Sequence, residues 1–247
     1  MANFFPRWTN LLPLKIIVCL GALGTAVVAG FTYYATPKAQ RVGYQPDQPI
    51  PYDHELHVEQ LGLDCRYCHS FVEHSGHANI PTASTCWNCH SHVQKGNPKL
   101  APLRAAMGVD VDHQPILDED GNQVPGKPIE WVRVHRSPDY VKFNHSAHLN
   151  RGISCQSCHG DVHKMPVVYH SKSLSMGFCL DCHREPEKHL RPLEEVYNLN
   201  YDVEEYLKTH EVRDDSGRLI TTQKDFGQFL KEKHYIKPKE SCSTCHY

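Results

Sequence analysis

The sequence has little excess of charge of either sign. It contains 26 Lys and Arg residues and 28 Asp and Glu residues, for a formal net charge of −2. Nucleic-acid binding depends on concentrated positive charge that neutralises phosphates, so this class of function has no electrostatic support. Long apolar runs are also scarce: there is one, near the N-terminus, and it carries no charged residue. The sequence therefore contains one segment that could form a membrane-spanning helix.

Cysteine and histidine are abundant instead, with 11 and 19 residues in 247. Ten of the 11 cysteines fall in CxxCH motifs, the signature of covalent haem c attachment. The two cysteines add to the two vinyl groups of one haem, and the adjoining histidine reaches the iron. The motifs, numbered as sites 1 to 5 in chain order, are Cys65, Cys68 and His69; Cys86, Cys89 and His90; Cys155, Cys158 and His159; Cys179, Cys182 and His183; and Cys242, Cys245 and His246.

Three other roles for paired cysteines fit this pattern poorly. Structural zinc sites use CxxC pairs, but zinc has no reason to require a histidine after every second cysteine. A disulfide framework does not require the histidine either, and a CxxC redox motif normally occurs once. The sequence therefore predicts five covalently bound haem c groups. No CxxCK variant occurs, so a catalytic haem of that type has no support.

Two HxxH segments supply further iron ligands. His54 and His57 precede site 1, and His145 and His148 precede site 3 at a similar distance, which indicates an internal duplication. Residues three apart share one face of a helix at different heights. One histidine of each pair can therefore complete its own haem while the other reaches a second. These four histidines cover four of the five irons.

The fifth iron has three candidate ligands. Met176, three residues before Cys179, is the leading one, with His135 as the runner-up and Met165 as a third. A thioether ligand would raise the potential of its haem, whereas core packing is the alternative role for a methionine. The remaining histidines outnumber the coordination positions. His74 and His77 are weaker candidate ligands, and the others are expected at the surface or near haem propionates: His92, His113, His163, His170, His189, His210 and His234.

Residues 16–34 form an uncharged run long enough to cross about 30 Å of hydrocarbon as a helix. A cleaved signal peptide is the alternative, but its apolar region is shorter and ends at small residues. Because haem c is attached outside the cytoplasm, we expect a single-pass protein of the bacterial inner membrane with its haem domain in the periplasm. Aromatic residues flank the run, as at membrane interfaces: Phe4, Phe5, Trp8, Phe31, Tyr33 and Tyr34.

We expect four regions: a cytoplasmic tail over residues 1–10, an anchor helix over 11–35, an extended proline-rich linker over 36–53 and a periplasmic five-haem domain over 54–247. Roughly 40 residues per haem are too few for a large side-chain core, so the porphyrins must supply much of the apolar surface. The expected fold class is mainly α, with little regular secondary structure and a haem-packed core.

Few elements are expected outside the haem motifs. Alternating apolar residues and turn residues predict strands and hairpins, and a period near 3.6 predicts helices. The predicted elements are a hairpin over residues 116–124 with its turn at Asp120 and Gly121, an apolar strand over 129–135, helical spacing over 193–210 interrupted at 198–200, a turn at 214–218 and a short amphipathic helix over 224–235.

Together these motifs resemble those of the pentahaem cytochrome c subunit of alternative complex III, a quinol-oxidising membrane assembly. The resemblance runs from about residue 50 to residue 195 and includes the C-terminal CSTCHY. More broadly, HxxH followed by CxxCH resembles the small class III multihaem cytochromes. The segments that carry the resemblance are PYDHELH, LGLDCRYCHS, IPTASTCWNCH, IEWVRVH, FNHSAH, GISCQSCHGDVHKMP and LSMGFCLDCHREPEKHLRP.

The class III resemblance implies that His54 ligates the haem of site 1 and His145 that of site 3, while His57 and His148 reach other haems. The alternative complex III resemblance implies an electron-carrier subunit without catalytic residues of its own. Its partners would be an iron–sulfur, molybdopterin-like subunit and integral membrane subunits that oxidise quinol. A monohaem cytochrome c or a terminal oxidase would accept the electrons.

Two other functions remain open from the residues alone. A membrane-anchored multihaem quinol dehydrogenase would oxidise quinol itself, but it needs a haem with an open coordination position at the membrane face. A soluble multihaem reductase also needs an open position, whereas this chain has candidate ligands for every iron. We therefore favour a chain that carries electrons and does not itself oxidise quinol.

Overall fold

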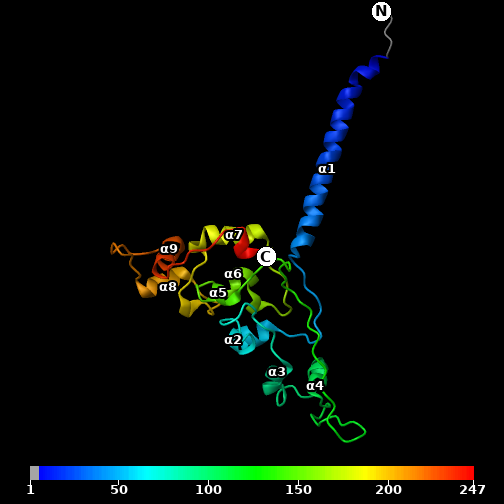
Figure 1. Ribbon diagram of the computed structural model, residues 1–247, viewed down its shortest axis with the longest axis vertical. Coiled ribbons are helices and arrows are strands. Elements are labelled where there is room, and N and C mark those ends of the chain that lie inside the picture. The colour runs from blue at the N-terminus through cyan, green and yellow to red at the C-terminus, as the bar shows by residue number, and fades with distance from the viewer. Residues whose placement is uncertain (1–5) are drawn as a thin grey trace, which may run out of the picture. The chain divides into compact units, whose positions relative to one another are not determined.

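The computed structural model describes residues 6–247, except for the side chains at position 7 and positions 35–39. The chain forms two compact units, Met1–Val42 and Gly43–Tyr247. All regular elements of the described part are helical (Figure 1). In the list that follows, η marks 3-10 helices and, for η2, a π-helix. The elements are η1 (Arg7–Leu11), α1 (Leu12–Gln40), η2 (Glu55–Gln60), α2 (Cys65–Cys68), α3 (Ala83–His90), η3 (Pro98–Leu100), α4 (Ala101–Met107), α5 (His145–Leu149), α6 (Cys155–His159), η4 (Val162–Lys164), α7 (Met176–Arg184), η5 (Pro186–Lys188), η6 (Leu193–Glu195), α8 (Val203–His210), α9 (Gln223–Lys233) and α10 (Cys242–Cys245).

The first unit is built on one apolar helix, α1. Residues Trp8–Tyr34 have a mean hydropathy of 2.2, so this stretch is long and apolar enough to cross a membrane. A membrane anchor and a signal sequence both meet that description. α1 continues to Gln40, past the predicted end of the anchor at residue 35. The predicted tail, with Phe4 and Phe5, lies partly outside the described residues.

The segment after α1 has no regular secondary structure and is bound along the second unit. The N–H of Gly43 donates to the carbonyl of His170 over 2.8 Å, and the N–H of His170 donates to Tyr44 over 2.9 Å. Further along, the side-chain amide of Gln48 donates to the carbonyl of Val132 over 2.8 Å and accepts from its N–H over 2.9 Å. Residues 43–53 therefore belong to the haem-motif unit.

This contact also explains why one predicted element is wrong. Residues 129–135 do not form a strand. Val132 is exposed, and its backbone N–H and carbonyl both bond to the side chain of Gln48 instead of to a neighbouring strand. The predicted hairpin over 116–124 is present as one antiparallel bridge, Leu117 to Gln123. Its turn is fixed by Asp118, whose carboxylate accepts from the N–H groups of Asp120 and Asn122.

The largest apolar core lies around α8 and α9, close to where the sequence predicts helices. Asp202 caps α8 and Thr222 caps α9, each accepting from the N–H three residues on. α9 packs so closely on η5 that a Cβ at Gly227 would overlap the carbonyl oxygen of Glu187. The core residues are Ile153, Leu190, Leu207, Ile220, Phe226, Leu230 and Ile236.

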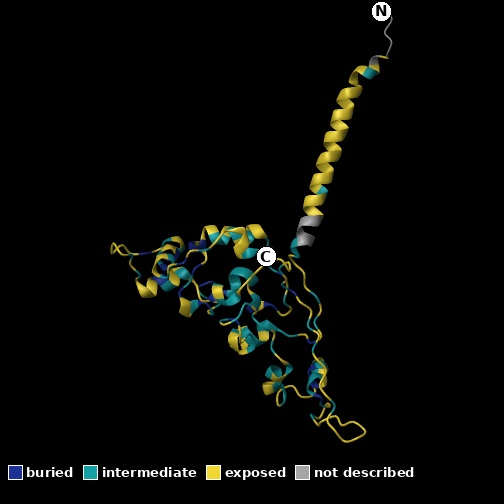
Figure 2. Cartoon of the chain, in the orientation of Figure 1, coloured by how far each residue is buried: buried dark blue, intermediate teal, exposed yellow. Residues whose placement is uncertain are grey.

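The side-chain core near the haem motifs is small. A second buried cluster contains Val72, Leu149 and Val196. Most other residues there are half-buried or exposed (Figure 2). The helical fold class, with short helices and long irregular connections, is thus confirmed over the described residues.

Candidate haem sites

Every CxxCH motif lies on a short helix that carries both of its cysteines. On a helix, residues three apart share a face, so the two thiols of each motif point to the same side. Side chains before the helices fix their starts: Asp64 accepts from the N–H of Arg66 over 2.8 Å, and Ser175 accepts from the N–H of Phe178 over 3.3 Å. The ten motif cysteines are all free thiols, as attachment to vinyl groups requires.

Six of the predicted iron ligands hold Nδ1 against a backbone carbonyl. A histidine fixed in this way presents Nε2, which is the usual arrangement at metal sites. These contacts therefore fit the role of iron ligands for the six histidines. The contacts are His57 to Asp53 at 2.7 Å, His69 to Asn79 at 2.7 Å, His90 to Val93 at 3.2 Å, His145 to Gly76 at 2.9 Å, His148 to Asn144 at 2.7 Å and His183 to Lys239 at 2.8 Å.

Three histidine pairs have the spacing that one iron requires. With metal–nitrogen bonds of about 2 Å on each side, two imidazoles on one iron have ring centres roughly 6 Å apart. The HxxH histidines meet this distance with the motif histidines of sites 2, 3 and 4. The ring centres are 6.3 Å apart for His57 and His90, 6.4 Å for His145 and His159, and 6.1 Å for His148 and His183.

Burial favours the neutral form of two candidate ligands, His54 and His159, and the neutral imidazole is the form that binds a metal. Burial, aided by His69 and His57, lowers the pKa of His54 to about 4. Burial, aided by His135 and other histidines, lowers the pKa of His159 to about 3. His54 is thus close enough to His69 of site 1 to interact with it. Its Nδ1 is buried without a hydrogen bond among the described residues.

An aromatic residue two positions before each HxxH was missed at the level of sequence. The ring of Tyr52 stacks on His57 at 4.5 Å and 23°, and meets His54 edge-on at 4.8 Å and 86°. The signal was available, because an aromatic residue, an Asx residue and HxxH recur together in YDHELH and FNHSAH. The second copy has the same geometry: Phe143 lies 4.7 Å and 27° from His148, and 4.8 Å and 87° from His145.

The Asx residue of each unit has a double role. The backbone carbonyl of Asp53 accepts from Nδ1 of His57, and its carboxylate accepts from the N–H of Leu56 over 3.0 Å. Asn144 does the same for His148 and for the N–H of Ala147, here over 3.2 Å. The duplication that the sequence indicates therefore extends to side-chain geometry.

The thiols place the five motifs in a definite spatial order. Thiols of different motifs interact across four pairs of sites, 1 with 2, 1 with 3, 3 with 4 and 4 with 5. Site 1 lies between sites 2 and 3, so the order is 2–1–3–4–5. Figure 1 shows α3, α2, α6 and α7 in this succession across the second unit. The interacting thiols include Cys86 with Cys68, Cys65 with Cys155, Cys158 with Cys182, and Cys179 with Cys245.

Burial and the neighbouring thiols shift the pKa values of several motif cysteines. Burial, with Cys182 and Cys179 nearby, raises the pKa of Cys158 to about 11. Cys155 donates a hydrogen bond to the sulfur of Cys65, which raises the pKa of Cys155 and lowers that of Cys65. Thioether formation removes these titrations, because the sulfur then carries no proton.

The three candidates for the fifth iron lie in different places. Met176 is the first residue of α7, is 63% exposed and precedes Cys179 by one turn. Met165 is buried, and its methyl carbon lies against Gly160, beside site 3. His135 lies 4.3 Å from His159 at 83°, which is too close for the opposite side of an iron. None of the three histidine pairs near 6 Å in the described part includes His246, whose ring lies 5.7 Å from that of Tyr140.

Two of the histidines expected at the surface are buried. His163 and His170 are each 1% exposed. Nε2 of His163 lies 3.6 Å from the carboxylate of Glu59 on the neighbouring η2. His113 is half-buried and its ring lies 4.6 Å from that of Trp87, inside motif 2. Burial rules out a surface position for His163 and His170 but not the other expected place, near haem propionates. His163 is buried where η2 packs on η4, and residues 43 and 44 bond to the backbone of His170.

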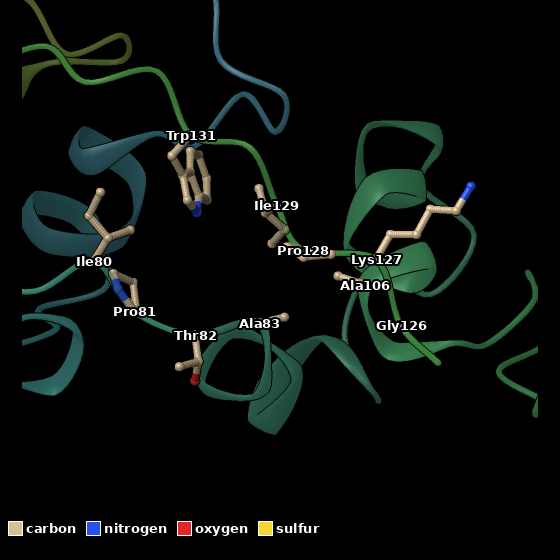
Figure 3. A pocket seen from close by; sticks show the side chains of 10 residues that line it. All are labelled: Ile80, Pro81, Thr82, Ala83, Ala106, Gly126, Lys127, Pro128, Ile129 and Trp131. Atoms are coloured by element: carbon tan, nitrogen blue, oxygen red, sulfur yellow. The ribbon is translucent and has the colours of Figure 1, made fainter. Parts of the chain in front are cut away.

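An apolar cavity of about 330 Å³ adjoins site 2 (Figure 3). Ala83 in its wall precedes Cys86 by one turn, so the cavity lies on the face of α3 that carries this thiol. The cavity provides apolar surface beside site 2 against which a flat apolar group could pack. The lining residues are Ile80, Pro81, Thr82, Ala83, Ala106, Gly126, Lys127, Pro128, Ile129 and Trp131.

Comparison with known proteins gives one informative similarity. No family model matches the chain. The chain is 29% identical over 188 residues to the menaquinone reductase, multiheme cytochrome c subunit, of Nitratidesulfovibrio vulgaris strain Hildenborough. The aligned region covers 68% of this chain and 81% of that protein. The similarity supports a multihaem cytochrome c with covalently bound haem that transfers electrons within a quinone-linked complex.

Proposed function

We propose that this protein relays electrons through five covalently bound haem c groups as a subunit of a membrane quinol-oxidising complex, alternative complex III. The observation that carries the proposal is the unbroken succession of sites 2–1–3–4–5. Bound haem supplies one-electron redox chemistry, and an iron with two protein ligands transfers electrons without binding a substrate. The chain itself supplies the ligands and the succession.

Four sites take two histidines each in this proposal. His57 pairs with His90, His145 with His159 and His148 with His183, on the measured ring separations. His54 pairs with His69, because the two interact and the other HxxH histidines are already used. Each HxxH unit then serves its own haem with the first histidine and the next motif in the chain with the second.

Met176 completes site 5 opposite His246. It lies one turn before Cys179, whose thiol interacts with Cys245 of site 5. Site 4 does not need it, because His148 already faces His183. A thioether ligand gives this haem a higher potential than its neighbours with two histidines, which suits the end of the relay nearest the acceptor.

The proposed setting follows from α1 and from haem attachment. α1 serves as the single anchor in a bacterial inner membrane, and Gly43–Tyr247 lies on the periplasmic side. The proposed partners are an iron–sulfur, molybdopterin-like subunit, integral membrane subunits that oxidise quinol, and a monohaem cytochrome c or a terminal oxidase.

The relative's name favours a second candidate, in which electrons flow the other way. That protein belongs to a menaquinone reductase. A related complex here would pass electrons through the same five sites toward menaquinone. The relay is the same in both cases, and the direction is set by the partners' potentials.

Stopped-flow spectroscopy of the isolated subunit tests the relay proposal. A small soluble reductant should reduce its haems rapidly, whereas menaquinol in detergent should reduce them only negligibly. Reduction by menaquinol should return when the partner subunits are restored. Rapid reduction by menaquinol without partners would contradict the proposal and favour a self-contained quinol dehydrogenase. Reduction of the restored complex by a soluble donor, with menaquinol as product, would select the reverse direction.

A further inference from the structure

The aromatic residues of the two HxxH units differ by one functional group, a hydroxyl. Both present an aromatic ring to their two histidines, with angles that differ by at most 4° (27° − 23°) and distances that differ by at most 0.2 Å (4.7 − 4.5 Å). The ring is a tyrosine in the first unit and a phenylalanine in the second. The hydroxyl of Tyr52 lies within hydrogen-bonding reach of the sulfur of Cys68, the second cysteine of site 1. Phe143 has no group that could do the same.

Tyr52 also lies where the first two sites meet. Its ring stacks on His57, which faces His90 of site 2, and meets His54, which lies beside His69 of site 1. It interacts with Cys86 of site 2 as well. A single half-buried side chain therefore contacts groups of two neighbouring sites.

Haem attachment turns the sulfur of Cys68 into a thioether that is bonded to the porphyrin and keeps its lone pairs. A thioether is a weak acceptor, so it can still receive the phenol O–H. A donor dipole at this sulfur favours the state of the haem that carries one more electron. In surroundings of low dielectric this electrostatic effect is stronger than in water.

We propose that Tyr52 tunes the first two haem sites: its ring orients the imidazoles of His57 and His54, and its hydroxyl, donated to the sulfur of Cys68, raises the reduction potential of site 1. The inference rests on the proposed haem ligation. Site 1 lies between sites 2 and 3, so its potential affects how electrons divide between the end of the relay and its middle. Tyr52 is a positioning residue, since it acts through ligands and attachment sulfurs.

The variant Tyr52→Phe removes the hydroxyl and keeps the ring. In a spectroelectrochemical titration of the full-length holoprotein, one potential should fall by a three- to tenfold change in its reduction equilibrium, about 30 to 60 mV for one electron. The other four potentials and the low-spin electron paramagnetic resonance signals should stay as in the parent protein. Tyr235→Phe, at an 83% exposed tyrosine, is the matched control and should change none of the five. Five unchanged potentials in Tyr52→Phe would overturn the proposed role of the hydroxyl.

The variant Tyr52→Leu removes the ring as well and tests the orienting role. The resonance signals of the haems ligated by His57 and His54 should shift, whereas those of sites 3 and 4 should not. Unshifted signals would overturn the orienting role. Intact mass of the parent protein separates this inference from its basis, because fewer than five haems would refute the haem-site proposal and this inference with it.

Discussion

At the scale of single residues, histidine placement is what determines the candidate sites. The CxxCH and HxxH motifs can be read from the sequence because covalent attachment and ligation need these residue types at these spacings. The sequence leaves open which iron each HxxH histidine reaches, since that depends on contacts such as His57 with His90 and His148 with His183. It also hides the burial of His163 and His170, which no local pattern marks.

Replacing His57 by Ala should therefore damage site 2 and leave the adjacent site 1 intact. The iron of site 2 loses its opposite ligand and should become high-spin, while the low-spin signal of site 1 persists. His148→Ala should do the same at site 4 and spare site 3. Magnetic circular dichroism and electron paramagnetic resonance measure both effects. His234→Ala, at a histidine outside the ring pairs, is the control. A change confined to site 1 in His57→Ala would show that the cross-site pairing is wrong.

Met176→His should lower one haem potential, that of site 5. Exchanging a thioether for an imidazole shifts the potential by on the order of 100 mV, within the roughly 0.8 V that axial ligands cover. The other four potentials should remain nearly unchanged. A redox titration followed at the haem absorption bands measures this, with Met107→Leu as a control at a methionine that is not a candidate ligand. An unaltered titration would move the fifth ligand to His135 or Met165.

At the scale of elements, the sequence predicts helices correctly where hydrogen bonds join residues that are close together in the chain. The caps at Asp202 and Thr222 make α8 and α9 readable from the sequence. The strand expected over 129–135 fails because the backbone of Val132 bonds to Gln48, 84 residues away. The hydrogen bond between Gly43 and His170 also joins residues far apart in the sequence. The sequence therefore could not predict that this part of the linker packs on the haem-motif unit. Propensity carries no information about partners that distant in the sequence.

Gly227→Ala should destabilise the contact between α9 and η5. The added Cβ would overlap the carbonyl oxygen of Glu187, which is backbone and cannot turn aside. Overpacking of this kind costs about 1–3 kcal/mol. Chemical denaturation, followed by far-ultraviolet circular dichroism, should show a lower midpoint than for Gly96→Ala. Gly96 has open space around its Cβ position and serves as the matched control. Equal midpoints for the two variants would contradict the close packing.

At the scale of the whole molecule, the five candidate sites follow one another in a single spatial order, 2–1–3–4–5. The cofactor and its number are readable from the motifs, but the spatial order is not. The chain order places site 1 at an end, whereas the contact of Cys65 with Cys155 places it between sites 2 and 3. That contact joins residues 90 positions apart (155 − 65). It arises from tertiary packing alone.

The protein purified from its native membrane should carry five haems and keep its N-terminal helix. Ten free motif cysteines and the long apolar stretch Trp8–Tyr34 lead to this expectation. Intact mass decides both points at once. A mass short by one haem would remove one site from the succession. A mass short by the N-terminal segment would identify the helix as a cleaved signal sequence.

The succession itself is tested most directly by removing its middle site. In the double variant Cys155→Ala and Cys158→Ala, held in the native complex, sites 2 and 1 remain on one side of the gap and sites 4 and 5 on the other. Intact mass and low-spin spectra first establish that four haems remain. Whichever end receives electrons, rapid mixing with the complex's electron donor should reduce two of the four haems at the parent rate and leave the other two oxidised during that phase. Reduction of all four at the parent rate would contradict a relay through site 3.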